Sequence, residues 1–305
     1  MINQDWQDEF ERLFLSGNEI DIKKSISIKS ENIPQKLYKY RKVDQYALDC
    51  LLNKQIWCTT LDNYNDIYEG NIKTEFLELQ KNVILKKASQ IGMPDTINIK
   101  NAKTPKELAE AVFPKEKWDE YIEKYQRDKK STENRIKTQI DDIQHSTKIC
   151  SFSDVKPYGN ILENSLMWAH YGDIYKGFCI EYDTTKSQHD FYPVFYSETI
   201  FDISKFLANF ISGEIDSPKM LPYFSAMKKL SSWQYEKEWR IILVDDKTVQ
   251  YKNIQFLEPS AIYLGPNVSS LNKFILKNIA NNLSIPIYAM HIPQSEYKLE
   301  YNELT

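Results

Sequence analysis

The stretch Ser231–Val244, with the sequence SSWQYEKEWRIILV, constrains the fold of this chain more than any other segment. It ends in four consecutive branched aliphatic residues with Trp and Tyr before them, a pattern that predicts a buried strand near the centre of a sheet. Because strand side chains alternate between faces, Glu236, Glu238 and Arg240 would share one face. Two carboxylates on one half-buried face repel each other unless a cation, water or substrate meets them, and their pKa values separate. The pattern therefore fits either an acid/base site or an edge strand whose Glu238 and Arg240 pair with neighbours.

The charge balance excludes a surface dedicated as a whole to nucleic acid or to anionic membranes. The 305 residues contain 39 Lys and Arg against 43 Asp and Glu, a net charge of -4. The first residues are acidic and polar, unlike a signal peptide, and no apolar run is long enough to cross a bilayer. We therefore expect a cytoplasmic protein without a membrane partner, on which a local basic patch is still allowed.

Neither the cysteines nor the histidines have the spacing of a metal site. The four cysteines stand singly in apolar contexts and the four histidines are scattered, so no Cys-x-x-Cys or His-x-x-x-His pair exists. With only 8 Gly, the chain also has no Gly-rich phosphate loop of the Rossmann or P-loop kind. We expect buried, reduced cysteines and a site without a metal.

Strand patterns alternate with segments of helical periodicity, which predicts an α+β protein. The expected strands lie near residues 37, 57, 150, 180, 240, 262 and 287 and should form one mixed or split central sheet of about six to eight strands. Residues 71–147, rich in Lys, Glu and Gln with apolar residues three and four apart, predict a helical insertion outside the sheet. Residues 1–30 should form an N-terminal helical arm, residues 227–230 a helix and residues 157–160 a turn. No Gly- or Ser-rich linker interrupts the chain, which favours a single domain over residues 1–305.

Two segments in the first quarter of the chain carry side chains suited to a binding or catalytic site. Arg41 stands at the end of a predicted strand, where a side chain enters a cleft rather than a core. Asn65 and Glu69 lie in a loop whose Asn and Asp residues are also ordinary turn formers.

A short predicted helix adds Trp168, His170 and Tyr171. A lone His among aromatic residues is more often a packed core residue than a catalyst. Polar residues scattered in an apolar chain are nevertheless costly unless they share a site. The residues that we expect in one cleft are Arg41, Trp168, His170, Tyr171, Glu236 and Glu238.

Several short motifs are more specific in combination than any one of them is alone. They are LYKYR at 37–41, NDxxE at 65–69, CSFS at 150–153, MWxHY at 167–171, KG at 176–177 and WxYExEWR at 233–240. Together they resemble the bacterial family catalogued as domain of unknown function 2971, over most of residues 34–290. The chain has Ile67 where that family has Pro. The resemblance by itself implies no chemistry.

A second resemblance does imply a chemistry. A Tyr-x-Tyr-Arg strand, a short helix, a strand with Trp57–Thr59 and a late Glu-x-Glu strand follow one another in the chain. This order is similar to the ADP-ribosyltransferase superfamily, which includes DNA- and RNA-modifying toxins, although the middle strand lacks Ser-Thr-Ser. In that superfamily an Arg or His on the first strand holds NAD, aromatic residues sandwich the nicotinamide, and a late Glu contacts the nicotinamide ribose.

This resemblance implies a role for each matching residue. The catalytic candidates are Glu238, beside the ribose, and Glu236, nearer the acceptor, with His170 and Tyr171. The candidates for binding NAD are Arg41, Tyr38, Tyr40, Trp57, Asn65, Glu69, Trp168 and Arg240. A carboxylate beside the ribose would stabilise an oxocarbenium-like centre, and an Arg would neutralise the pyrophosphate, so no metal is needed.

The resemblance thus implies an NAD-dependent ADP-ribosyltransferase, a bacterial toxin or anti-phage defence effector that modifies nucleic acid or protein, with an antitoxin or chaperone as a further partner. Two alternatives stay open. One is a non-catalytic module that binds a nucleotide or nucleic-acid end through aromatic residues and Arg41. The other is a metal-free hydrolase or nuclease with Glu236, Glu238 and His170 as acid and base.

Overall fold

The computed structural model of the protein describes residues 5–92, 96–154, 164–185, 187–215, 218–294 and 298–304. In these residues the fold is α+β, with one mixed main sheet of ten strands and two small two-stranded sheets. The expected fold class is confirmed, and the main sheet has more strands than the sequence patterns predicted. The turn expected at 157–160 lies outside the described residues, as do residues 1–4 of the expected arm and 93–95 of the expected insertion.

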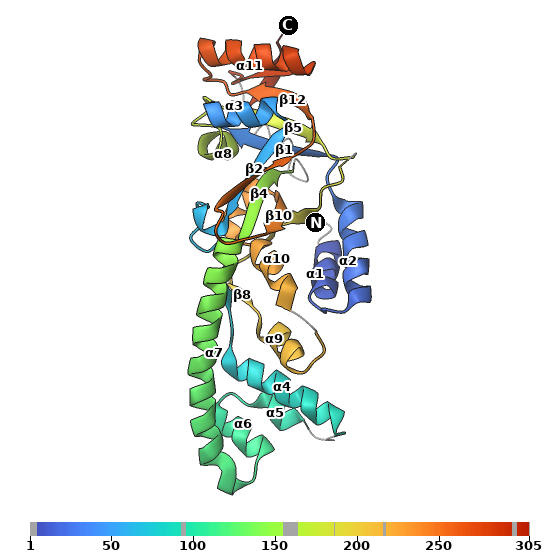
Figure 1. Cartoon of the computed structure of the whole chain (residues 1–305), viewed down its shortest axis with the longest axis vertical. Coiled ribbons are helices and arrows are strands. Elements are labelled where there is room, and N and C mark those ends of the chain that lie inside the picture. Colours follow the sequence, from blue (N-terminus) through green and yellow to red (C-terminus); the bar gives the residue numbers. More distant parts are fainter. Residues whose placement is uncertain are drawn as a thin grey trace.

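The main sheet has the order β11-β2-β4-β1-β5-β12-β13-β14, and β10 and β6 extend it from β4 (Figure 1). Its strands are β1 (Lys36–Arg41), β2 (Gln55–Thr60), β4 (Thr147–Ser153), β5 (Phe178–Asp183), β6 (Phe191–Pro193), β10 (Glu238–Val244), β11 (Tyr251–Gln255), β12 (Pro259–Leu264), β13 (Ile287–His291) and β14 (Glu300–Glu303). The small sheets pair β3 (Ile72–Lys73) with β8 (Phe201–Asp202), and β7 (Phe195–Ser197) with β9 (Lys228–Leu230). The sheet is mixed because β12 and β13 run parallel while its other pairs are antiparallel.

Some helices, among them α3, α8 and α11, lie at one end of the main sheet, and others, among them α4 to α7, extend away from its other end (Figure 1). They are α1 (Asp5–Phe14), α2 (Glu19–Asn32), α3 (Gln45–Leu52), α4 (Phe76–Gln90), α5 (Ile97–Asn101), α6 (Pro105–Val112), α7 (Trp118–Ser146), α8 (Ser165–His170), α9 (Ser204–Ile211), α10 (Leu221–Ala226) and α11 (Ser270–Leu283), with the 3₁₀ helices η1 (Leu61–Asn63), η2 (Lys115–Lys117), η4 (Pro218–Met220) and η5 (Ser231–Glu236). The long helix α7 leads from the sheet to α4, α5 and α6 at the opposite end of an elongated molecule (Figure 1). No described helix is both long and apolar enough to cross a membrane.

The main sheet splits at β4, because this strand pairs with three others, β10, β1 and β2. β10 pairs with all of β4, from Glu238 opposite Ser153 to Val244 opposite Thr147. β2 pairs with the first half of β4, and β1 pairs with it through Tyr38 opposite Ser153. Because a strand has two edges and β10 occupies one, β1 and β2 share the other and separate beyond it. The split places the end of β1 and the middle of β2 on either side of an opening.

The single strand expected over Ser231–Val244 requires a correction. Residues 231–236 form η5, Lys237 turns the chain in a left-handed conformation with φ of 48°, and β10 begins only at Glu238. The described part of β4 ends at Ser153, opposite Glu238, and the backbone contact between the two segments goes no further than the bond from Asp154 N to Lys237 O at 3.0 Å within the described residues. Glu236 therefore approaches the face of Glu238 from the end of a helix and not by strand alternation.

The helix expected at 227–230 is also wrong. α10 ends at Ala226, and β9 pairs in parallel with β7, with Lys228 opposite Phe195 and Leu230 opposite Ser197. A run this short has no periodicity that separates helix from strand, so tertiary pairing decides its conformation.

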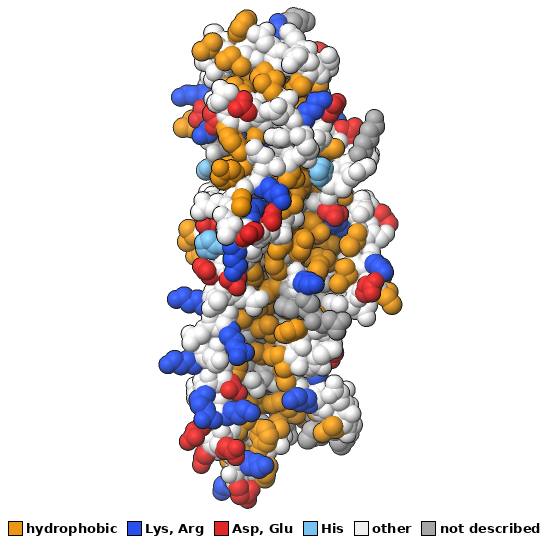
Figure 2. Space-filling model, viewed as in Figure 1, with side chains coloured by type: hydrophobic (Ala, Val, Ile, Leu, Met, Phe, Trp, Pro, Cys, Tyr) orange, Lys and Arg blue, Asp and Glu red, His pale blue; other side chains and the backbone are white. Residues whose placement is uncertain are grey.

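Aromatic contacts attach the helices to the sheet and to one another. Trp6 of α1 stacks on Trp239 of β10 with ring centroids 6.0 Å apart, which docks the N-terminal arm on the central strand. Phe76 of α4 meets Tyr125 of α7 edge to face at 4.9 Å, far from the sheet. On the face drawn in Figure 2, apolar side chains fill the seams between elements, while charges of both signs are interspersed along α7. The helical segment therefore presents no surface of one sign on this face.

One buried carboxylate ties three neighbouring strands together. Glu181 of β5 accepts hydrogen bonds from the hydroxyls of Tyr38 on β1 at 3.0 Å and of Tyr263 and Ser260 on β12, each at 2.9 Å. Lys36 Nζ adds an ion pair at 2.9 Å. Burial raises the pKa of Glu181, but the contact from Lys36 and then those from the three hydroxyls outweigh burial and lower it.

We expect Glu181→Gln to lower the free energy of unfolding at pH 7 by about 1.5–3 kcal/mol, because hydrogen bonds to a charged group are lost. A carboxyl with a depressed pKa stabilises the fold above its unfolded pKa of about 4.3, and this contribution disappears as the pH falls through the folded pKa. The difference between wild type and variant in urea unfolding should therefore shrink below pH 4. Exposed Glu258, which pairs with Lys54, provides the control Glu258→Gln, which should have little effect. A Glu181→Gln difference that grows on acidification would contradict this account.

Candidate functional site

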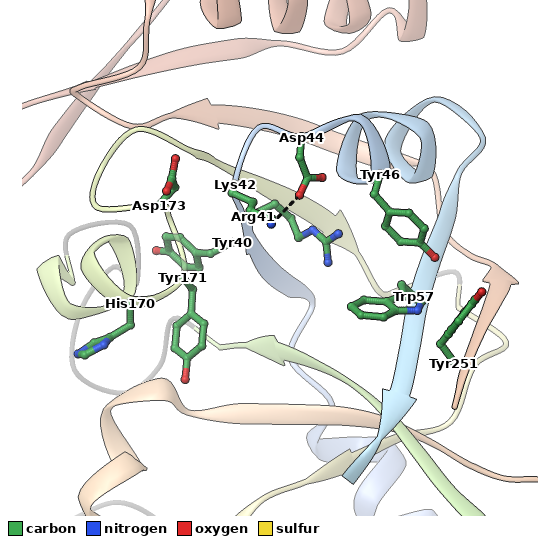
Figure 3. Close-up of a pocket in the computed structure, with 10 residues that line it drawn as sticks. All are labelled: Tyr40, Arg41, Lys42, Asp44, Tyr46, Trp57, His170, Tyr171, Asp173 and Tyr251. Atoms are coloured by element: carbon green, nitrogen blue, oxygen red, sulfur yellow. Dashed lines mark ion pairs between the residues drawn. The ribbon is translucent and has the colours of Figure 1, made fainter. Parts of the chain in front are cut away.

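A cavity of about 560 Å³ lies where β1 and β2 separate. Its lining residues are Tyr40, Arg41, Lys42, Asp44, Tyr46, Trp57, His170, Tyr171, Asp173 and Tyr251 (Figure 3). They come from the end of β1, the start of α3, β2, β11 and the end of α8. Segments far apart in the sequence thus meet at the split in the sheet.

Two glycines allow the end of α8 to approach the end of β1. A Cβ on Gly177 would lie 2.2 Å from the backbone oxygen of Arg41, and one on Gly172 would lie 2.8 Å from the Trp168 ring. Between them, residues 173–175 take three consecutive left-handed conformations, with φ of 50°, 52° and 65°. Such a turn is unfavourable for residues other than Gly and is held by its surroundings, including the bond from Gly177 N to Gly172 O at 2.8 Å. The Lys-Gly motif is therefore a packing requirement of the cavity wall.

Two cationic side chains, Arg41 and Lys42, line the cavity, and they differ in whether an acidic side chain pairs with them. Lys42 pairs with Asp44 at 3.1 Å, as the dashed line in Figure 3 marks. Half-buried Arg41 forms no hydrogen bond or ion pair through its side chain within the part of the chain that is described, and its guanidinium extends toward Tyr46 and Trp57 (Figure 3). Arg41 is thus available to an anionic ligand.

Behind this wall lies a cluster of five buried charged side chains, and Arg240 is its centre. Arg240 is 0 % exposed and binds Glu69 through two nitrogens, at 2.6 and 2.9 Å. Its Nε donates to Glu238 at 2.6 Å, and one further N–H donates to the Ala226 carbonyl at 2.6 Å. The guanidinium therefore joins β10 to the loop after η1 and to the end of α10.

Lys229 of β9 completes the cluster. Its Nζ lies 2.6 Å from Glu236 and 2.5 Å from Glu238, and 3.8 Å from Glu69. Three carboxylates thus surround two cations, Lys229 and Arg240, and all five side chains are buried. Fully ionised, the cluster would carry one net negative charge, which is costly to bury.

One proton on Glu236 removes this excess charge. Burial, followed by the hydrogen bond to Glu238 and the charge of Glu238, raises the pKa of Glu236 to about 8. Burial also acts on Glu238, but the charges of Arg240 and then Lys229 outweigh it and hold the pKa of Glu238 well below its usual range. Burial raises the pKa of Glu69 against the opposing effect of Arg240. The carboxyl without a guanidinium contact, Glu236, therefore holds the proton at neutral pH.

Tyr171 connects the cluster to the cavity. Its hydroxyl hydrogen-bonds to Glu236 Oε1 and accepts a bond from Asn65 Nδ2 at 3.0 Å. Burial, and then the charge of Glu236, raises the pKa of Tyr171. The Tyr171 side chain also lines the cavity (Figure 3), so it is the link between the buried proton and the space that a ligand would enter.

The structure brings together some of the residues expected in one cleft and separates others. Arg41, Tyr40, Trp57, His170 and Tyr171 line the cavity. The His170 side chain is exposed at its rim, in ring contact with Tyr171 and Tyr235, and not packed in the core.

The remaining expected residues do not line the cavity. Trp168 is 0 % exposed and packs edge to face on Tyr40, behind the wall. Tyr38 belongs to the Glu181 group. The oxygens of Glu238 and Glu69 and most N–H groups of Arg240 are engaged within the buried cluster, which corrects the expectation that these residues face a ligand.

The sequence patterns missed six residues of the site, among them Asp44 and Asp173 of the cavity lining. Lys42, Tyr46 and Tyr251 line the cavity, and Lys229 neutralises the carboxylates. Two close carboxylates did indicate that a cation, water or substrate meets them, but no spacing rule identified Lys229, because it reaches them from a separate small sheet. Tyr251 lies nearly two hundred residues from Trp57 and meets it only through pairing of β11 with β2.

Comparison with known proteins identifies part of this region. Residues 167–241 match the family described as Protein of unknown function (DUF2971), so this part of the chain is a domain of that family. The match runs from α8 to β10 and includes Tyr171, Lys229, Glu236, Glu238 and Arg240. No curated protein and no solved structure matches the chain.

We expect Glu236→Gln to change how stability depends on pH. The folded protein keeps a proton on Glu236 up to about pH 8, whereas the unfolded chain releases it near pH 4.3, so wild-type stability falls with rising pH across this window. Gln cannot release a proton. The stability of Glu236→Gln relative to wild type should therefore increase by up to about 1.4 kcal/mol per pH unit between pH 5 and 8.

Chemical denaturation at pH 5, 6, 7 and 8 measures this effect. Glu133→Gln, on the exposed side of α7, is the matched control and should differ from wild type by the same small amount at every pH. Parallel stability curves for Glu236→Gln and wild type would show that Glu236 is ionised in the folded protein.

Proposed function

We propose that the protein binds a nucleotide in the cavity between β1 and β2. The observation that carries this proposal is the Arg41 guanidinium, which has no ion pair among the described residues, at a cavity of about 560 Å³ lined by several aromatic side chains. A guanidinium suits the planar, bidentate recognition of phosphate, and aromatic rings stack on nucleobases. The cavity volume falls within the usual range for small-molecule sites.

Arg41→Ala should weaken nucleotide binding by about 1.5–3 kcal/mol, roughly 10- to 150-fold in Kd, because a charge-assisted contact is lost. Isothermal titration calorimetry with ATP, ADP and NAD measures this effect. Arg135→Ala, which removes an exposed arginine of α7, is the matched control and should bind like wild type. Equal affinity of the Arg41→Ala and Arg135→Ala proteins, both with unchanged melting, would reject this cavity as the nucleotide site.

A second candidate function is ADP-ribosyl transfer from NAD to a nucleic-acid or protein acceptor, and the Tyr171–Glu236 pair favours it. In this reaction the nicotinamide–ribose bond breaks, nicotinamide leaves, and an acceptor oxygen or nitrogen loses its proton as it bonds to the ribose carbon. A group that takes that proton works best with a pKa near the working pH. Glu236, with a pKa of about 8, lies one hydrogen bond behind the Tyr171 hydroxyl at the cavity wall. Glu236, in the ionised form whose share grows as the pH approaches 8, would then take the proton through the Tyr171 hydroxyl, whereas Glu238 is bound to Lys229 and Arg240.

Glu236→Gln and Tyr171→Phe should each lower ADP-ribose transfer by about 10²-fold or more while NAD binding is largely kept, because each breaks the proton path without removing a cavity wall. Incubation with labelled NAD, nucleic acid and cell lysate measures transfer, and calorimetry measures binding. Wild-type transfer in both variants would remove the proposed proton path. Nucleotide binding without any turnover of NAD in the wild-type protein would leave a non-catalytic binding module.

A further inference from the structure

Two free cysteines face each other where the main sheet opens. The antiparallel ladder between β2 and β4 ends with Thr59 opposite Ile149. The next position along both strands brings Cys58 opposite Cys150, and both side chains lie in the same buried core cluster. Opposite residues of an antiparallel pair have Cα atoms about 4.5–5.5 Å apart, within the range of about 4.4–6.8 Å that a disulfide spans. The strand pairing therefore brings the two thiols within reach of a disulfide.

The Cys150 sulfur accepts two hydrogen bonds. One comes from the Cys58 S–H and the other from Lys39 Nζ of β1, which also donates to the Ser151 carbonyl at 3.0 Å. Lys39 is half-buried and has no acidic partner within the described part of the chain. A cation that no carboxylate neutralises stabilises a neighbouring thiolate. Cys150 is therefore the sulfur of the pair that is suited to attack.

The two thiols differ in how readily they ionise. Burial raises the pKa of Cys150, but the hydrogen bond from Cys58 and then the charge of Lys39 outweigh burial and lower it. The same hydrogen bond, followed by burial, raises the pKa of Cys58. A thiolate thus lies beside a thiol that keeps its proton, which is the arrangement of an attacking and a resolving cysteine.

The other two cysteines lack this arrangement. Cys179 of β5 is as fully buried as the pair, and burial raises its pKa. Cys50 of α3 is half-buried, and burial raises the pKa of its thiol as well. Neither hydrogen-bonds to a second thiol among the residues that the structure describes. Cys179 is therefore a matched internal control for the pair.

We propose that Cys58 and Cys150 are a redox-active pair, activated by Lys39, which hydrogen peroxide oxidises to a disulfide between β2 and β4. The Cys150 thiolate attacks one peroxide oxygen, the O–O bond breaks, and hydroxide leaves, so that Cys150 becomes a sulfenic acid. The Cys58 sulfur then bonds to the Cys150 sulfur, the S–O bond breaks, and the departing hydroxide takes the Cys58 proton and leaves as water. Two electrons pass from the sulfurs to the peroxide, whose oxygens leave as hydroxide and water.

Burial of the pair restricts the oxidant. Cys58 and Cys150 are both 0 % exposed, so a peroxide molecule can approach where a bulky disulfide such as oxidised glutathione cannot. On the same edge of β4, the ladder with β1 starts again only at Ser153. Cys150 therefore lies at the fork between β1 and β2, where no ladder bonds hold the strands together. This inference does not depend on the proposed nucleotide-binding function.

Mass spectrometry of the native full chain tests the proposal. After treatment with hydrogen peroxide at pH 7, we expect a mass lower by about 2 Da, because two thiol hydrogens are lost. Digestion should give a peptide pair linked through Cys58 and Cys150, which dithiothreitol separates, while Cys179 stays reduced. Oxidised glutathione should leave the mass unchanged. Thiols that stay free under peroxide, or oxidation of Cys179 as fast as that of the pair, would overturn the proposal.

Two further variants assign the roles. Cys58→Ala keeps the attacking sulfur and removes the resolving one, so peroxide should carry Cys150 to the sulfenic and then the sulfinic acid, gains of about 16 and 32 Da. Lys39→Met should slow disulfide formation at pH 7 by about tenfold and move its pH dependence to higher pH, because the thiolate loses its cation. Lys39→Arg should keep the wild-type rate.

Lys273→Met, which removes an exposed lysine of α11, is the matched control for the Lys39 variants and should react like wild type. Thermal melting of every variant shows whether it is folded. The wild-type rate and pH dependence in folded Lys39→Met protein would overturn the activation by Lys39. An unoxidised Cys150 in folded Cys58→Ala protein would overturn its role as the attacking sulfur.

Discussion

The Arg240 guanidinium holds the centre of this structure together. It joins β10 to Glu69 in the loop after η1 and to the end of α10, and with Lys229 it compensates the charge of Glu238. Removing one partner of a buried ion pair typically costs about 3–5 kcal/mol, because the other charge stays buried and unpaired. The buried ion pairs therefore link the loop after η1, η5, β9 and β10 to one another, next to the wall of the cavity.

The buried charged cluster and the cavity are separate parts of the candidate site. The cluster holds two cations, three carboxyls and one proton in a buried site, where burial and the neighbouring charges raise the pKa of Glu236. At the cavity, Arg41 has no ion pair within the described part of the chain and lies among aromatic side chains, which suits binding of an anion. Tyr171 belongs to both, because its ring faces the cavity and its hydroxyl contacts Glu236. In the proposed function, ligand binding would therefore rest on the cavity and proton transfer on the Tyr171–Glu236 pair.

The family match and the cavity cover different parts of the chain. Residues 167–241 supply the end of α8 and the buried cluster except Glu69, while Arg41, Tyr46, Trp57 and Tyr251 come from elements outside that range. The matched segment thus contributes one wall of the cavity and the protonated Glu236. The rest of the chain contributes the cationic side chains Arg41 and Lys42 and the aromatic residues Tyr46, Trp57 and Tyr251. The cavity that we propose as a nucleotide site is lined by residues of both parts.

The sequence by itself determined the strands with strong apolar patterns, the helices of residues 71–147 and the face shared by Glu238 and Arg240, because these follow from local periodicity. It also identified Arg41, Trp57, His170 and Tyr171, which the structure brings to one cavity. Only the tertiary structure decided that η5 interrupts the predicted strand, where the described part of β4 ends opposite Glu238. Only it separated the buried cluster from the cavity and supplied Lys229 and Tyr251, because contacts between residues distant in the chain depend on strand pairing and on charge compensation, which no local pattern records.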